Sequence, residues 1–169
     1  MAGDRREPFR PGDGDGAGVA YLYDGRAVTG GATAPRLRLA DAGARPGDAL
    51  GATVAVGDFD RDGFADVAVA APGAGCAALC AAERRVDDRT DSHAGRVLNW
   101  RGGPAGLDPA PPRSLTAPSP APYDRFGAAL AVGDLDGDGA AELIVGAPGQ
   151  RRAGAARGVD RGAVYVYRG

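Results

Sequence analysis

The sequence contains the same acidic loop twice, and its carboxylates have the spacing of metal ligands. The first copy, Asp58 to Asp66, reads DFDRDGFAD, and the second, Asp134 to Glu142, reads DLDGDGAAE. Oxygen ligands at positions 1, 3, 5, 7 and 9, with a glycine at position 6, suit a cation of calcium size. We therefore expect two Ca²⁺ sites. Position 7 would contribute its backbone carbonyl, and the expected ligands are Asp58, Asp60, Asp62, Phe64 and Asp66 in the first loop and Asp134, Asp136, Asp138, Ala140 and Glu142 in the second.

The spacing of these residues has a physical reason. In a tightly curled loop, alternate side chains point to the same interior, so the carboxylates at positions 1, 3 and 5 converge. The glycine at position 6, Gly63 or Gly139, takes the left-handed backbone conformation that closes the curl. A divalent cation then replaces repulsion between neighbouring carboxylates with oxygen-metal contacts. The alternative is an acidic, solvated turn, but two copies in equivalent surroundings favour the metal site.

The residues around the two loops exclude an EF-hand, the calcium motif in which a loop joins two helices. An EF-hand also needs a glutamate at position 12, whereas that position is Val69 in the first copy and Val145 in the second. The flanking segments are strand-like instead, rich in valine, leucine and alanine. Each loop is therefore predicted to connect a β-hairpin, with strands at 53–56, 67–70, 129–132 and 143–145.

The duplication extends well beyond the loops. Residues 50–73 and 126–149 are identical at 14 of 24 positions, which indicates an internal repeat. A third strand at 95–102 is matched by residues 162–169, and the same pattern occurs once more at 18–25. The chain is thus predicted to consist of repeated β units.

These motifs resemble a known repeat. Phe126-Gly127, the aspartate-rich loop, Gly146-Ala147-Pro148 and the Gly-x-Val-Tyr-Val-Tyr strand at 162–167 are similar to the FG-GAP repeat of the integrin α-subunit N-terminal β-propeller. The first copy departs from that pattern, with Leu50 for the phenylalanine and Ala-Ala-Pro at 70–72. The second copy has Glu142 where the family usually has aspartate. The longer side chain is expected to change the geometry or affinity of calcium binding without abolishing it.

The resemblance implies an all-β fold, a partial β-propeller of antiparallel four-stranded blades with the cation in the hairpin between the first two strands. About nine strands, or two and a quarter blades, are expected. Further strands are predicted at 36–40 and near 113–116. The expected organisation is a flexible N-terminal segment at 1–16, the end of a preceding blade at 17–49, one FG-GAP blade at 50–118 and an incomplete FG-GAP blade at 119–169.

Propellers usually close with four to eight blades. The remaining blades would come from a longer chain or from homo-oligomerisation; an open array with exposed edges is a third possibility. The chain has 29 Leu, Ile, Val and Phe among 169 residues, so its apolar side chains bury little area. Metal binding is therefore expected to supply part of the folding free energy, with calcium in a structural role.

The resemblance implies a non-catalytic role in adhesion or protein-protein interaction, with an unidentified protein or glycan partner. An accessory domain of a secreted hydrolase or phospholipase and a self-assembling structural module are the alternatives. An enzyme is not expected, because the chain has three serines, no Gly-x-Ser-x-Gly motif and a single histidine, His93, in a charged variable loop.

Charge and hydropathy narrow the function further. The net charge is −2 with a pI of about 5.4, and all 20 basic residues are arginine, which argues against nucleic-acid binding. No apolar stretch is long enough to span a membrane, and the polar segment Met1 to Asp15 has no signal-peptide core. The family resemblance nevertheless implies an extracellular or cell-surface location.

Two cysteines, Cys76 and Cys80, lie in the variable loop after the first Ala-Pro-Gly. A local disulfide would fit an oxidising compartment. A pair of free thiols and half of a metal site are the alternatives. A zinc site is not favoured, because His93 is the single histidine and the chain has no further cysteine.

Overall fold

The described part of the chain folds into three antiparallel β-sheets. The computed structural model describes residues 17–25, 29–31, 34–75, 93–108, 110–151 and 162–168. The prediction of an all-β fold is confirmed, since within these residues only Gly25 and Thr29 are helical. The strands are β1 (Ala20–Leu22), β2 (Leu37–Leu39), β3 (Thr53–Gly57), β4 (Asp66–Ala71), β5 (Arg96–Trp100), β6 (Arg113–Leu115), β7 (Ala129–Gly133), β8 (Glu142–Ala147) and β9 (Ala163–Tyr167).

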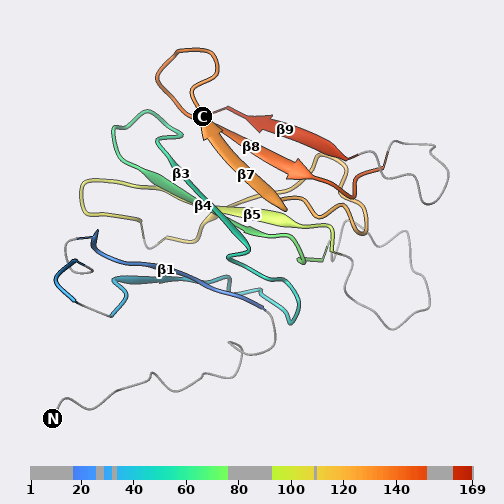
Figure 1. The fold of residues 1–169 in the computed structure, drawn as a ribbon, viewed down its shortest axis with the longest axis horizontal. Helices are drawn as coiled ribbons and strands as arrows, with labels where there is room; N and C mark the ends of the chain where they lie inside the picture. Colours follow the sequence, from blue (N-terminus) through green and yellow to red (C-terminus); the bar gives the residue numbers. More distant parts are fainter. Residues whose placement is uncertain are drawn as a thin grey trace, which may run out of the picture.

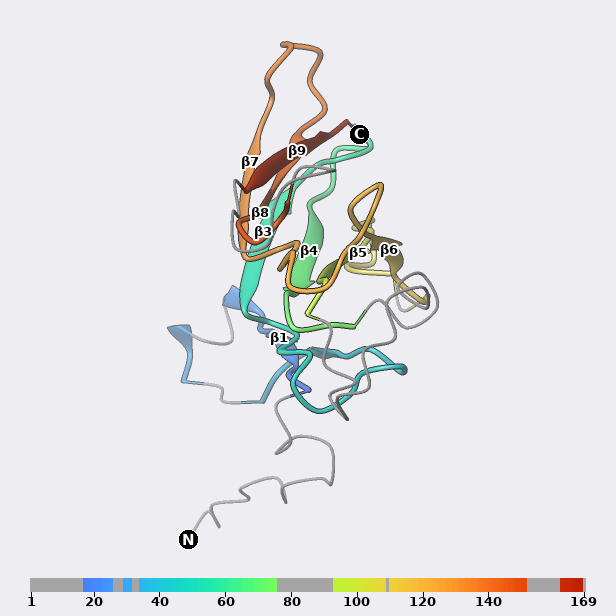
Figure 2. The ribbon, with the colours of Figure 1, turned by 90° about the vertical axis from the view of Figure 1, so that its right-hand side faces the viewer.

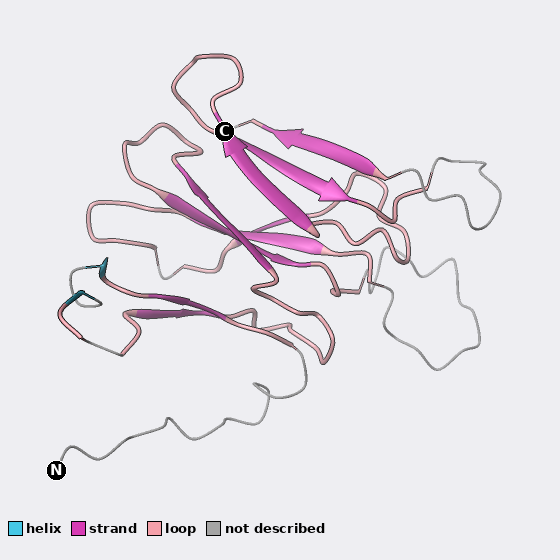
Figure 3. Cartoon of the chain, viewed as in Figure 1, coloured by secondary structure: helices cyan, strands magenta, loops and turns pink. Residues whose placement is uncertain are grey.

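Each sheet is a simple meander along the chain. The strand orders are β1-β2, β3-β4-β5-β6 and β7-β8-β9, so neighbours in sequence are neighbours in the sheet. The three sheets lie one above another, with β3 to β6 in the middle (Figures 1, 2 and 3). The nine strands of the described residues fall at the positions predicted from sequence, and the arrangement is that of a partial β-propeller.

The middle sheet is covered on both faces. Its second strand, β4, has all six residues buried. One apolar cluster lies between the middle sheet and β7 to β9, and it includes Ala68, Val97, Phe126 and Val145. The other lies between the middle sheet and β1 to β2, with Leu39, Val69, Leu98 and Trp100. A strand buried on both faces reads as a continuous apolar run, which explains why β4 lacks polar alternation.

Aromatic side chains fill the space between the middle sheet and the third sheet. Phe126 is fully buried, and its ring centroid lies 5.7 Å from that of Tyr165 and 5.9 Å from that of Tyr167. The equivalent tyrosines of the first sheet, Tyr21 and Tyr23, are 45% and 44% exposed. The tyrosines of β9 therefore pack between two sheets, whereas the equivalent tyrosines at β1 lie on an open face.

In each repeat, the Ala-Pro-Gly segment at the end of the second strand packs against a turn that contains a buried aspartate. The amide of Gly73 donates to the carbonyl of Asp48 at 3.0 Å, and the amide of Gly149 donates to that of Asp124 at 3.1 Å. A Cβ atom at either glycine would lie within 2 Å of a backbone oxygen, so the close approach requires glycine. Both aspartates are buried.

The first strands of the two repeats, β3 and β7, lie side by side. The hydroxyl of Thr53 in β3 donates to the carbonyl of Gly127 at 2.7 Å, just before β7. At the far end of β3, Gly57 faces Val132, and a Cβ atom on Gly57 would lie 2.6 Å from its side chain. This contact brings the hairpin tips of the two sheets to the same end of the molecule.

The part of the chain that the structure describes contains no helix long and apolar enough to cross a membrane. Cys76 and Cys80 lie outside the described residues, so the three interpretations of this pair stay open.

Candidate metal centre

Each acidic loop is the tip of a β-hairpin, as predicted. In the first hairpin Gly57 at the end of β3 pairs with Asp66 at the start of β4. In the second, Gly133 of β7 pairs with Glu142 of β8. Positions 1 to 8 of each loop therefore lie beyond the paired strands, whereas position 9 is the first residue of the returning strand.

The carboxylates at positions 1, 3 and 5 converge in the first loop. One oxygen each from Asp58, Asp60 and Asp62 lies within 4.8 Å of the other two. Backbone amides fix two of these side chains: Asp58 accepts from the amide of Asp62 at 3.1 Å and from that of Gly63 at 2.8 Å. Asp62 in turn accepts from the amide of Phe64 at 2.8 Å. The loop thus holds Asp58 and Asp62 in place through its own backbone.

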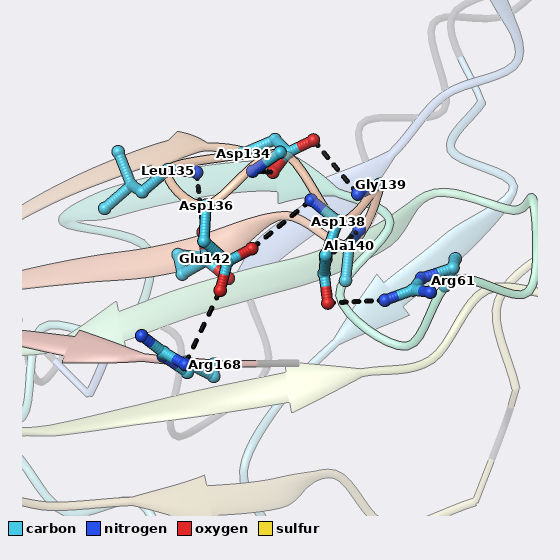
Figure 4. A network of polar contacts seen from close by, with 10 residues as sticks. Arg61, Asp134, Leu135, Asp136, Asp138, Gly139, Ala140, Glu142 and Arg168 are labelled. Carbon is cyan, nitrogen blue, oxygen red and sulfur yellow. Dashed lines mark hydrogen bonds and ion pairs between the residues drawn. The ribbon is translucent and has the colours of Figure 1, made fainter.

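The second loop repeats this arrangement. Asp134, Asp136 and Asp138 form the same three-carboxylate cluster. Asp134 accepts from the amides of Gly137 at 2.7 Å and Gly139 at 3.1 Å, and the bond from Gly139 appears in Figure 4. The two clusters thus share a residue pattern and the hydrogen bond from the amide at position 6 to the carboxylate at position 1.

The backbone is left-handed at two positions of each loop. Gly63 and Gly139, at position 6, have φ angles of 86° and 92°, as the sequence predicts. Position 4 is left-handed as well, and sequence reasoning missed it. Gly137 has a φ of 76° there, but in the first loop the same conformation is taken by Arg61, with a φ of 59°. A residue with a Cβ atom adopts this conformation at a cost.

The position-9 carboxylates do not belong to the three-carboxylate clusters. Asp66 and Glu142 are almost completely buried, and they accept from the amides of Phe59 at 3.0 Å and Leu135 at 2.7 Å, respectively. Asp66 also accepts from the amide of Gly102 at 2.6 Å. Both side chains therefore fasten position 2 of the loop to the base of the hairpin, and their coordination of a cation stays a prediction.

The environment of Asp66 opposes its ionisation. Burial raises the pKa of its carboxyl above the ordinary value of 3.8. The hydrogen bonds from Gly102 and Phe59 lower the pKa, and the charges of Asp60 and Asp62 raise it again. A cation close to these carboxylates would favour the charged form of Asp66.

The position-7 residues differ in their surroundings. The side chain of Phe64 is 40% exposed, whereas that of Ala140 is buried. Neither side chain offers a ligand atom, so the contribution expected from this position is a backbone carbonyl, and it stays a prediction.

Arginines contact the carboxylates of both loops. Arg101, just after β5, lies 3.2 Å from Asp60, and Arg168, just after β9, lies 3.5 Å from Asp136. Arg101 and Arg168 are equivalent residues of the two repeats. Asp60 and Asp136 are equivalent as well, since each is position 3 of its loop. In addition, Arg61 of the first loop lies 2.5 Å from Asp138 of the second. Figure 4 shows Arg61 and Arg168 reaching the second loop from two sides.

The donor set fits a hard divalent cation. Carboxylates supply all the clustered ligand atoms, which is the chemistry that Ca²⁺ prefers. One oxygen of Asp60, Oδ1, is buried and has no hydrogen-bond partner. A buried oxygen without a partner is costly, and a bound cation would satisfy it. The clustered carboxylates therefore fit calcium in their chemistry.

The two loops also touch through their backbones. The amide of Ala141, at position 8 of the second loop, donates to the carbonyl of Asp58 at 2.8 Å. Because Asp58 is position 1 of the first loop, this bond joins the two candidate sites directly.

Comparison with known proteins identifies the repeat. The family profile described as FG-GAP repeat matches residues 50–98 and 126–167, the two segments that carry the acidic hairpins. The chain belongs to the FG-GAP repeat family. The expectation drawn from the residue pattern is thus confirmed, and the partial propeller described above is built from repeats of this family.

FG-GAP relatives of the chain include integrins and a phospholipase. Integrin alpha-PS5 of Drosophila melanogaster is 37% identical over 131 residues, which covers 75% of this chain and 10% of the relative. Phosphatidylinositol-glycan-specific phospholipase D of Homo sapiens is 35% identical over 128 residues, covering 71% of this chain and 13% of the relative. Integrin alpha-X of Mus musculus is 34% identical over 106 residues, with coverage of 55% and 8%. The chain thus spans about a tenth of the length of the curated relatives it matches.

Proposed function

We propose that the chain is a calcium-binding segment of an FG-GAP propeller that acts without catalysis in adhesion or protein-protein interaction. The observation that carries calcium binding is the duplicated cluster, in which three carboxylates converge within 4.8 Å at the tip of the first hairpin of each repeat. Asp58, Asp60 and Asp62 would hold one cation, and Asp134, Asp136 and Asp138 the other. Calcium would supply charge neutralisation there and no reaction chemistry.

The position of the loops supports a structural role for calcium. The two tips lie together where β3 and β7 meet, and the amide of Ala141 bonds to the carbonyl of Asp58 across that junction. A cation that orders either tip therefore also stabilises the contact between the middle sheet and the third sheet. Because many of the core side chains between these sheets are alanines, this added stabilisation matters for the folded state.

Thermal unfolding with and without calcium tests this proposal. The wild-type chain is compared with Asp60→Ala and Asp136→Ala, and with Asp108→Ala as a control carboxylate outside both loops. Saturating one site at 100 times its dissociation constant adds about 2.7 kcal/mol to the unfolding free energy. We expect wild type and the control to gain stability in millimolar Ca²⁺ and each loop variant to lose a large part of that gain. An equal melting temperature with and without calcium in the wild-type chain contradicts the proposal.

An open apolar face supports the proposal that further blades complete the propeller. Val97, in the third strand of the middle sheet, is fully buried by the third sheet. Its counterpart in the last repeat, Val164, is 69% exposed, and Val166 beside it is 52% exposed. We propose that this face is covered by a further blade, from a longer chain or from another copy. Mass measurement by light scattering distinguishes them: self-assembly gives multiples of the chain mass, and a monomer favours a longer chain.

The similarity to phosphatidylinositol-glycan-specific phospholipase D favours one further candidate, an accessory propeller beside a catalytic domain. In both candidates the chain itself catalyses nothing, and an extracellular or cell-surface location is proposed. The coding region on either side separates the two, because an accessory propeller is continuous with a hydrolase domain. Flanking sequence that encodes only further FG-GAP repeats would contradict the accessory role.

A further inference from the structure

Among the residues that the structure describes, three arginines contact the clustered carboxylates, and their distribution over the two loops is unequal. The first loop has one such contact, from Arg101 to Asp60. The second loop has two, from Arg168 to Asp136 and from Arg61 to Asp138. Arg101 and Arg168 belong to the same repeat as the loop that they contact. Arg61 does not, because it is position 4 of the first loop and reaches position 5 of the second.

The backbone of Arg61 indicates that this contact has a specific role. Its φ of 59° is left-handed, a conformation that is unfavourable for a residue with a side chain. The second loop has Gly137 at the same position, with a φ of 76°. The first loop thus carries an arginine where the conformation favours glycine, and the side chain extends across the junction between the sheets to the other loop.

We propose that Arg61, a residue of the first loop, lowers the calcium affinity of the second loop through its ion pair with Asp138. This inference rests on the proposed calcium binding. A guanidinium and a divalent cation compete for the same carboxylate oxygens and repel each other, so each arginine in contact with a loop lowers calcium affinity there. The Arg61 contact is partly exposed, with 56% and 47% of the two side chains accessible, so its influence is moderate.

The expected change in the calcium affinity of the second loop can be taken from the strength of exposed ion pairs. Their strength corresponds to a change of about two- to fivefold in a binding constant. Calcium in the second loop should therefore bind about two- to fivefold more tightly once the charge of Arg61 is removed. The backbone bond from Ala141 to Asp58 holds the two loops together in either case, since it does not involve the arginine side chain.

Calorimetric calcium titration of single-site chains tests the effect of Arg61 on the second loop. Asp62→Asn disables the first loop and leaves the three arginine contacts unchanged, so that the second site is measured alone. Asp134→Asn disables the second loop in the same way. Into each background we place Arg61→Gln, Arg61→Lys, Arg101→Gln or Arg168→Gln. Arg113→Gln is the matched control, because Arg113 is exposed and forms none of the three contacts.

The proposal predicts a distinct pattern. Arg101→Gln strengthens binding at the first site, and Arg168→Gln strengthens it at the second. Arg61→Gln strengthens the second site by about two- to fivefold, although Arg61 is in the first loop, and changes the first site less. Arg61→Lys keeps the charge and stays close to wild type, as does Arg113→Gln. High salt reduces the differences between the charge-removing variants and wild type.

Two failures are distinguishable. If neither single-site chain binds calcium while both remain folded by circular dichroism, the proposed calcium function is wrong. If both bind calcium but Arg61→Gln leaves the second site unchanged, or shifts both sites equally, the calcium function stands and the specific effect of Arg61 on the second loop is overturned.

Discussion

Alanine at Gly63 should destabilise the chain through the backbone alone. Gly63 has a φ of 86°, and a Cβ atom built on it meets no other atom within 4 Å. The substitution therefore creates no clash, and its cost is the left-handed conformation, roughly 1–2 kcal/mol. In a chain of 169 residues this corresponds to a fall in melting temperature of about 2–4 °C for each kcal/mol.

Gly25→Ala is the matched control for Gly63→Ala. A Cβ atom on Gly25 also meets nothing within 4 Å, and its φ lies outside the left-handed range. That substitution should be neutral or should stabilise by about 0.4–1 kcal/mol. Urea unfolding in the presence of EDTA measures both variants without a contribution from calcium. Equal unfolding free energies for the two variants would refute the assignment of Gly63 as the backbone turn that closes the loop.

Three further predictions concern the packing and the open face. Phe126→Leu should lower the unfolding free energy measured in urea by about 2 kcal/mol, because it removes the ring contacts with Tyr165 and Tyr167. A loss below about 0.5 kcal/mol would contradict this packing. Burial raises the pKa of Tyr167 above 10.0, so the folded state keeps the phenol proton longer than the unfolded state and the unfolding free energy falls as the pH rises above 10. Tyr167→Phe should remove this part of the alkaline loss of stability. An unchanged dependence of stability on pH in that variant would contradict the role of Tyr167. Val164→Asp should change the unfolding free energy of the monomer by less than about 0.5 kcal/mol, because Val164 is exposed. The same variant should abolish any self-association seen by light scattering. A cost above about 1.5 kcal/mol would mean that the face around Val164 is covered within the chain.

The sequence predicted the strands and the hairpin tips because both depend on local patterns. Valine and alanine runs interrupted by D-x-D-x-D-G specify a strand, a tight loop and a second strand, and the duplication repeats that information. The convergence of Asp58, Asp60 and Asp62 likewise follows from loop geometry. Position 9 was harder to interpret, because the burial of Asp66 under the loop depends on the amide of Gly102, which follows another strand.

The arginine contacts were missed because they join distant parts of the chain. Arg101 and Asp60 meet only when β5 lies beside β4, and nothing in either local segment indicates this. One signal was available: an arginine follows the third strand in both copies, at Arg101 and Arg168. The contact of Arg61 with the other loop had no such signal, since the second copy has glycine at that position. It depends on the packing of β3 against β7.

The number of calcium ions bound by each chain tests the central claim most directly. Equilibrium dialysis against Ca²⁺, with protein and metal both quantified, should give two ions for the wild-type chain. It should give one ion for Asp60→Ala, one for Asp136→Ala and none for the double variant, with Asp108→Ala retaining two. Fewer than one ion per folded wild-type chain at millimolar calcium, or a number unaffected by the loop substitutions, would contradict the assignment of the two hairpin tips as calcium sites.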